Sequence, residues 1–142
     1  MTQLLYDVVE VVAMQLISSD ASVIPVSASL SFRTSDPYTV RVVFTGPQTR
    51  STWLLGRELL VQGMLAISDA PAGTGDVQVW RDDDPDFALI SLSGVEGSAL
   101  LAAPTSPLEA FLSRTEQLVP FGSESVRMET EISALIAALL TA

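Results

Sequence analysis

The sequence predicts an α+β fold in which antiparallel β-sheets, closed as a barrel or packed as a sandwich, are followed by helices. Residues 4–55 and 76–103 are predicted to be mainly strands, and several of their segments alternate apolar and polar side chains. The last third repeats apolar residues at helical spacing instead. The chain has 142 residues, of which 48% are apolar, so we expect one domain over residues 1–142.

The first predicted strand, residues 8–17, is apolar on both of its faces. Val9 and Val11 lie on one face, and Val12 and Met14 lie on the other. A strand of this kind usually has both faces covered. Because a domain of this size has little material to cover the second face, we expect another subunit to lie against it.

The next segments alternate cleanly and predict half-buried strands. Ile24 to Phe32 places apolar residues at every second position, and Thr34 to Pro37 supplies turn formers. Tyr38 to Phe44 returns as the next strand, and a further strand covers residues 49–55.

A short helix over residues 57–63 interrupts the strands and ends at Gly63. We expect Arg57 and Glu58, at its start, to form a surface ion pair or a cap contact. Three strands over residues 76–81, 87–93 and 98–103 complete the sheet.

Two helices are predicted over residues 106–118 and 130–141. Ser106, Pro107 and Glu109 match the N-cap, N1 and N3 positions of a capping box. Leu118 extends the apolar face of the first helix, and Thr130 is the expected cap of the second.

The chain contains no His, Cys or Lys. Their absence excludes Ser-His-Asp and Cys-His nucleophiles, thiolate or imidazole zinc sites and Schiff-base lysines. We therefore predict a non-catalytic protein and assign no catalytic, cofactor-binding or metal-binding residue. The longest apolar tract near the C-terminus, residues 132–140, is too short to span a membrane, and residues 1–17 do not resemble a secretory signal, so we expect no membrane insertion and a cytoplasmic location.

Four aspartates crowd into the segment between two predicted strands, at Asp82, Asp83, Asp84 and Asp86. A calcium loop requires acids at alternate positions, a glycine and a distal glutamate, and this run lacks that register. Aspartate and proline are turn formers, so a solvated hairpin loop is the favoured interpretation over a weak divalent-ion contact.

Four apolar residues are candidates for partner binding: Trp53, Trp80, Leu118 and Phe121. Core or subunit packing is the main alternative for the two tryptophans, which lie in strand-like segments. Phe121 lies in the connector between two helices, where it is either tucked under the connector or offered to a partner. A nucleic-acid stacking surface is disfavoured, because seven arginines face 17 acids and the net charge is −10.

Five motifs follow one another along the chain: "SDPYTVRVVF" (35–44), "RELLVQG" (57–63) after Trp53, "GTGDVQVW" (73–80), "SLSGVEGSALLAAP" (91–104) and "LEAFLSRTEQLVPFGSE" (108–124). In this order they resemble the SsgA-like proteins, the sporulation and cell-division proteins of actinobacteria. The resemblance covers the chain from about residue 7 to its end.

This resemblance implies a fold similar to the Whirly single-stranded DNA-binding proteins and assembly as a homotrimer. It also implies a role in sporulation-specific septation, in which the protein recruits the tubulin-like division protein FtsZ to the division septum together with another SsgA-like protein. The alternative function is single-stranded nucleic-acid binding by the same fold. The negative charge favours protein partners over nucleic acid.

Overall fold

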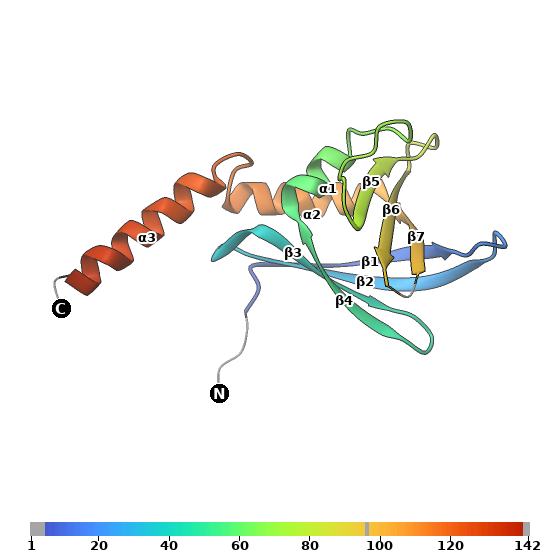
Figure 1. The fold of residues 1–142 in the computed structure, drawn as a ribbon, viewed down its shortest axis with the longest axis horizontal. Helices are drawn as coiled ribbons and strands as arrows, with labels where there is room; N and C mark the ends of the chain where they lie inside the picture. Colours follow the sequence, from blue (N-terminus) through green and yellow to red (C-terminus); the bar gives the residue numbers. More distant parts are fainter. Residues whose placement is uncertain (1–4, 96, 141–142) are drawn as a thin grey trace.

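All seven strands belong to one antiparallel sheet of order β4-β3-β2-β1-β7-β6-β5. The computed structural model describes residues 5–95 and 97–140. The α+β class is confirmed, although the strands form one continuous curled sheet and not two separate ones (Figure 1). The strands are β1 (Val8–Ile17), β2 (Val23–Arg33), β3 (Asp36–Thr45), β4 (Arg50–Gly56), β5 (Val77–Arg81), β6 (Phe87–Gly94) and β7 (Gly97–Pro104), and the helices are α1 (Arg57–Gly63), α2 (Thr105–Leu118) and α3 (Glu124–Leu140).

The curl of the sheet originates where β1 meets β7. β1 pairs with β2 over its whole length, from Val8 to Ile17, but with β7 only through Gln15, Leu16 and Ile17. Strands β4 to β1 therefore form one half of the sheet, and β7 to β5 form the other. The two halves cross at a steep angle, joined at this short seam (Figure 1).

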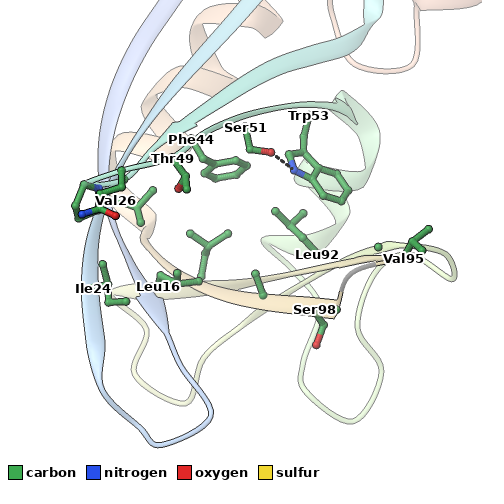
Figure 2. Close-up of a pocket in the computed structure, with 17 residues that line it drawn as sticks. Leu16, Ile24, Val26, Phe44, Thr49, Ser51, Trp53, Leu92, Val95 and Ser98 are labelled. Carbon is green, nitrogen blue, oxygen red and sulfur yellow. Dashed lines mark hydrogen bonds between the residues drawn. The ribbon is translucent and has the colours of Figure 1, made fainter.

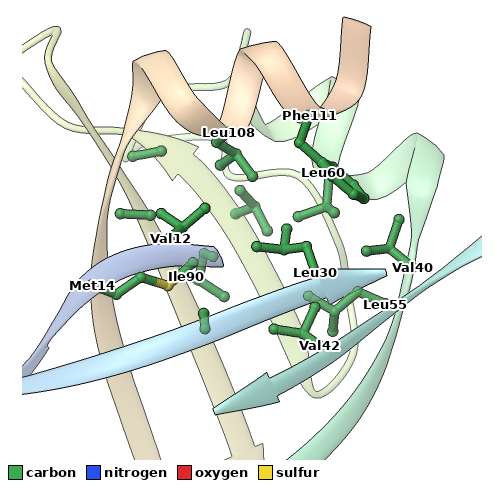
Figure 3. Packing of buried hydrophobic residues seen from close by; sticks show 14 of the residues in the cluster. Val12, Met14, Leu30, Val40, Val42, Leu55, Leu60, Ile90, Leu108 and Phe111 are labelled. Carbon is green, nitrogen blue, oxygen red and sulfur yellow. The ribbon is translucent and has the colours of Figure 1, made fainter. Parts of the chain in front are cut away.

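The core lies between the inner face of the curled sheet and helices α1 and α2 (Figure 3). Leu30 of β2 and Val42 of β3 point toward Leu60 of α1 and Phe111 of α2, and each of the four is at most 1% exposed. The alternating apolar residues of the predicted strands supply this face, because successive side chains of a strand point to opposite sides.

The two faces of β1 have different environments. Val12 and Met14 are buried in the core, whereas Val9 and Val11 are 47% and 64% exposed on the outer face. Both faces are therefore apolar, as the sequence indicates. The outer face leaves large apolar side chains in contact with solvent.

The capping box predicted for α2, with Ser106 as its N-cap, is wrong. The helix begins at Thr105 with Pro104 as its N-cap, and no side chain caps it. The Thr105 hydroxyl and amide instead donate to the carbonyl oxygens of Pro85 and Asp86, at 3.0 and 2.8 Å. These contacts with the β5–β6 turn accompany an N-cap that lies two residues before the predicted one, Ser106.

The last turn of α2 and the start of α3 also differ from prediction. Leu118 is 46% exposed and lies outside the core, because the chain turns and buries Val119 instead. Helix α3 begins at Glu124, so Thr130 lies inside the helix and is not its cap. The predicted end of this helix at Thr141 lies outside the described residues.

Helix α3 extends away from the rest of the molecule (Figure 1). Among the side chains of α3 that the structure describes, five large apolar ones are at least 51% exposed: Ile132, Leu135, Ile136, Leu139 and Leu140. None of the helices in the described ranges is long and apolar enough to cross a membrane.

Candidate protein-docking groove

A groove of about 870 Å³ opens between the β3–β4 hairpin and the β6–β7 hairpin (Figure 2). It lies where the two halves of the sheet diverge, beyond the part of the inner face that the helices cover. Its large apolar lining residues are Leu16, Ile24, Val26, Phe44, Trp53, Leu92, Val95 and Leu101.

The strand register explains why apolar side chains form the floor of this groove. Val26 and Phe44 continue the inward-facing rows of β2 and β3, and Leu92 and Leu101 continue those of β6 and β7. Each is less than 9% exposed, so the floor of the groove is an extension of the core. The groove is therefore an apolar surface, continuous with the core, that a ligand can reach from solvent.

Trp53 forms one wall of the groove. Its ring is half-buried against the core, and its indole Nε1 donates a hydrogen bond of 3.0 Å to the Ser51 hydroxyl. Figure 2 shows both side chains at the rim. A tryptophan held in this way presents a rigid apolar surface with its polar atom satisfied, which is typical of anchor residues in protein interfaces.

The described lining residues of the groove include no charged side chain. The polar lining residues, Gln48, Thr49, Ser51 and Ser98, are all uncharged. An uncharged apolar segment is the occupant that such a lining accepts with least desolvation cost. Among the described residues, no three acidic, His or Cys side chains gather in a way that could hold a metal ion.

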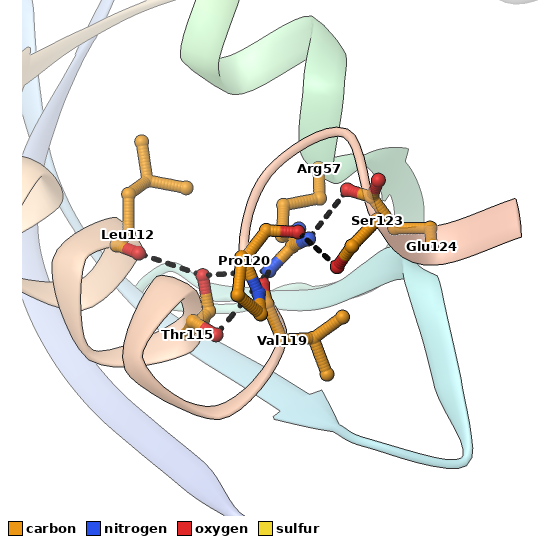
Figure 4. A network of polar contacts seen from close by, with 7 residues as sticks. All are labelled: Arg57, Leu112, Thr115, Val119, Pro120, Ser123 and Glu124. Atoms are coloured by element: carbon orange, nitrogen blue, oxygen red, sulfur yellow. Dashed lines mark hydrogen bonds and ion pairs between the residues drawn. The ribbon is translucent and has the colours of Figure 1, made fainter. Parts of the chain in front are cut away.

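A second feature positions the helices around the body. Arg57 is 0% exposed, which corrects the expectation of a surface ion pair. Its guanidinium donates to the carbonyl oxygens of Val119 at 2.7 Å and Thr115 at 3.3 Å, and to the Glu124 carboxylate (Figure 4). We call this cluster the Arg57 clasp, since it joins the end of α2 to the start of α3.

Aromatic rings enclose the same guanidinium. Its central carbon lies 5.1 Å from the ring centre of Phe32 and 4.8 Å from that of Phe121. Burial penalises the charge on Glu124, but the hydrogen bond from Arg57 outweighs it together with backbone hydrogen bonds and lowers the pKa of that carboxyl. The clasp therefore pairs the positive charge at the start of α1 with the negative charge at the start of α3.

The four predicted contact residues occupy different environments. Trp53 lines the groove, and Trp80 is half-buried on β5, on the face opposite the buried Val79. Leu118 is exposed at the end of α2, whereas Phe121 is half-buried against Arg57. The structure thus places only Trp53 in the groove and tucks Phe121 under the connector.

The aspartate run forms the turn between β5 and β6. The amide of Asp82 donates to the Phe87 carbonyl at 3.0 Å, and the amide of Asp86 donates to the Asp84 side chain at 3.0 Å. Residues 83–86 are exposed. This geometry confirms the solvated hairpin loop.

Sequence reasoning missed the groove and the burial of Arg57. In "LLGRELL" the arginine stands between pairs of leucines, and this apolar setting was a signal of burial. The groove has no comparable local signal, because its walls come from two hairpins, β3–β4 and β6–β7, that are far apart in the chain.

Comparisons with known proteins agree with this architecture. The family model described as "Streptomyces sporulation and cell division protein, SsgA" matches residues 26–124. The sporulation-specific cell division protein SsgB of Streptomyces coelicolor is 40% identical over 129 residues, which cover 87% of this chain and 91% of that protein. SsgB of Salinispora tropica is 39% identical over 132 residues, covering 88% and 90%.

Solved structures give the same result. A structure of SsgB, reported with mutations that correlate to longitudinal cell division during sporulation of Streptomyces coelicolor, matches with a TM-score of 0.75 and 40% identity over 84% of this chain and 94% of that chain. An SsgA-like sporulation-specific cell division protein of Thermobifida fusca matches with a TM-score of 0.78 and 36% identity, over 92% and 93%.

The fold and the groove define an α+β protein with one curled antiparallel sheet and an apolar cleft between its halves. The similarity covers most of both chains, in sequence and in three dimensions. The chain belongs to the SsgA family of sporulation and cell division proteins, and the expected resemblance to its SsgB members is confirmed. The relatives are named as cell division proteins and not as enzymes.

Proposed function

We propose that this protein is a non-catalytic adaptor in sporulation septation, which recruits or positions FtsZ at the division septum by protein–protein contact. The apolar groove with Trp53 at its wall is the observation that supports this proposal. A concave, uncharged surface with an aromatic anchor suits a peptide segment or a helix of a protein partner. Another SsgA-like protein is the second proposed partner.

The chain's chemistry supports the same interpretation. A sequence without His, Cys or Lys offers few groups for acid–base or nucleophilic catalysis. Because the chain belongs to a family of cell division proteins, we propose that it acts at the division septum.

Co-sedimentation with GTP-assembled FtsZ from the same organism, at two salt concentrations, tests the adaptor role. We expect saturable pelleting that persists at the higher salt, because the groove is apolar and salt screens only ionic contacts. Ala99→Glu places a charge on the groove lining, because Ala99 is half-exposed and lies opposite Leu92 on the face that borders the groove, and it should weaken pelleting about tenfold. Ser113→Glu, on an exposed position of α2, is the matched control. If both variants pellet equally, FtsZ does not bind in the groove. If the wild type does not pellet, the protein does not recruit FtsZ directly.

Nucleic-acid binding is the alternative function, and the placement of the arginines disfavours it. Arg57, Arg81 and Arg114 each pair with a glutamate, so these cations are partly neutralised. We expect no mobility shift of single-stranded DNA at micromolar protein and low salt. A shift that disappears steeply as salt rises would favour this alternative instead.

We also propose that the protein works as a homotrimer. The apolar outer face of β1 supports assembly, since Val11 is 64% exposed. Light scattering should return three times the chain mass of 15.1 kDa.

A further inference from the structure

The sheet ends in two edge strands, β4 and β5, which differ in what lies against them. The loop before β5 covers its edge, since the Val79 amide donates to the Ala72 carbonyl oxygen at 3.0 Å. The Arg81 amide likewise donates to the Ala66 carbonyl oxygen at 2.9 Å. In the part of the chain that the structure describes, β4 pairs with β3 and no segment pairs with its other side. An uncovered edge strand is a template on which another chain can pair.

The hydrogen bonds of the β3–β4 hairpin show which backbone groups of β4 point to the open edge. The Gly46 amide donates to the Thr49 carbonyl oxygen at 2.9 Å, and hydrogen-bonded pairs recur at every second residue of an antiparallel ladder. Ser51 and Trp53 therefore bond to β3. The groups that point to the open edge belong to the alternate residues, Arg50, Thr52 and Leu54. Each of these residues offers a donor and an acceptor to a partner strand.

The open edge of β4 lies beside the groove. Helix α1 follows β4 directly and packs against β5, so it closes the gap between the two edges at one end (Figure 1). At the other end, Ser51 and Trp53 of β4 line the groove (Figure 2). Successive side chains of a strand point to opposite faces, so a segment paired with residues 50–54 places every second side chain in the groove beside Trp53. The uncharged lining accepts apolar side chains there.

Two arginines mark the outer face of the same edge. Among the arginines whose side chains the structure describes, only Arg41 and Arg50 have neither an ion pair nor a ring contact. Arg41 precedes the inward-facing Val42, so it lies on the face away from the groove. Arg50 precedes the groove residue Ser51 and lies on that outer face too. In a chain of net charge −10, these two cations favour acidic side chains at the outward positions of a partner segment.

We propose that an extended segment of a partner protein binds the open edge of β4 as an additional strand. Its backbone pairs with residues 50–54, and its apolar side chains enter the groove. Its acidic side chains meet Arg41 and Arg50. Main-chain hydrogen bonds supply affinity in this mode of recognition, and the alternate side chains supply specificity. This inference rests on the proposed adaptor function and names the form in which FtsZ occupies the groove.

Thr52→Pro tests the edge, because it removes an outward amide while the strand stays extended. Thr52→Val keeps the amide and a branched side chain, so it is the matched control. In co-sedimentation with GTP-assembled FtsZ from the same organism, we expect Thr52→Pro to bind about tenfold more weakly than Thr52→Val, which binds like the wild type. Equal binding by the two variants overturns the proposal. Circular dichroism verifies folding, and Leu54→Pro with Leu54→Val replaces this pair if Thr52→Pro is not folded.

Amide hydrogen exchange, followed by NMR, gives a direct readout of the new strand. With unassembled FtsZ bound, the Thr52 and Leu54 amides should exchange about tenfold more slowly than in the free protein, because each gains a hydrogen bond. The Trp53 amide, which already bonds to β3, should change less. Unchanged exchange at both outward amides in the complex overturns the proposal.

Arg50→Glu tests the charge of the partner segment. We expect binding to weaken about threefold at about 50 mM salt and to recover at about 500 mM, because salt screens an exposed ion pair. Arg114→Glu on α2 changes the net charge equally and is the control, which should bind like the wild type. Equal binding by these two variants at low salt overturns the acidic character of the segment.

The outcomes separate the edge from the proposed function. A wild type that pellets together with an unaffected Thr52→Pro variant overturns the edge pairing and leaves recruitment intact. A wild type that does not pellet overturns recruitment and the edge pairing together. Light scattering on the protein alone identifies a different occupant: if Thr52→Pro lowers the mass, the edge pairs between copies, and its pairing with FtsZ is overturned.

Discussion

Arg57 shows how a single side chain organises the helical part of the molecule. It satisfies two carbonyl oxygens at the end of α2 and the carboxylate at the start of α3, and two aromatic rings cover its faces. Arginine suits this site better than lysine, because its planar fork donates in several fixed directions and stacks on rings.

Replacing Arg57 with alanine should destabilise the fold. The variant Arg57→Ala leaves the α2 carbonyls and the mostly buried Glu124 without their donor, and the expected loss is about 3 kcal/mol in the free energy of unfolding. Urea denaturation measures the loss. Arg50→Ala, at an exposed position on β4, should change the same quantity by less than about 0.5 kcal/mol. Similar values for the two variants would contradict the structural role of the clasp.

The clasp also makes stability depend on pH. Because Glu124 has a lowered pKa in the folded protein, its stabilising effect is complete above the ordinary value of 4.5 and is lost as the pH falls through the folded-state pKa. Thermal unfolding of the wild type and Glu124→Gln from pH 7 to pH 3 should show a difference that shrinks below pH 4.5. A difference that stays constant over this range would argue against the ion pair.

At the scale of elements, close approach of α1 to β5 depends on Gly63. A Cβ at this position would lie 2.3 Å from the Val79 Cγ1 atom, closer than packed atoms allow. Gly63→Ala should therefore lower the free energy of unfolding by about 1–3 kcal/mol. Gly75→Ala is the matched control, because nothing lies within 4 Å of its Cβ position. Urea denaturation compares the two, and an equal effect would show that Val79 moves aside without cost.

The elements that sequence predicts well are those fixed by local pattern. The buried row of β2, from Val26 to Phe32, follows directly from alternation. The predicted start of α1 at Arg57 is confirmed, whereas the predicted starts of α2 and α3 were wrong. A distant partner decides the start of α2, where Thr105 donates to the Pro85 carbonyl. The same cause explains the candidate site: Trp53 was identified as a residue, but the groove beside it exists only after two distant hairpins diverge.

At the scale of the whole molecule, net charge opposes the self-association that we propose. Copies with a charge of −10 repel, whereas the exposed outer face of β1 is apolar. Raising the salt concentration from about 50 mM to 500 mM should thus strengthen self-association, because it screens the repulsion and leaves the apolar contact intact. Analytical ultracentrifugation at several protein concentrations measures this change. Weaker association at high salt would indicate joints built from ion pairs.

The short seam between β1 and β7 has a mechanical consequence. Three residue pairs, from Gln15 to Ile17 and from Leu100 to Ala102, carry the connection between the two halves of the sheet. Leu16 and Leu101 from this seam also line the groove floor. A small change of twist at these pairs is magnified along the hairpins, so the seam sets the distance between the groove walls. If a partner binds in the groove as we propose, its affinity should therefore depend on the twist of the sheet at this seam as well as on the residues that it contacts.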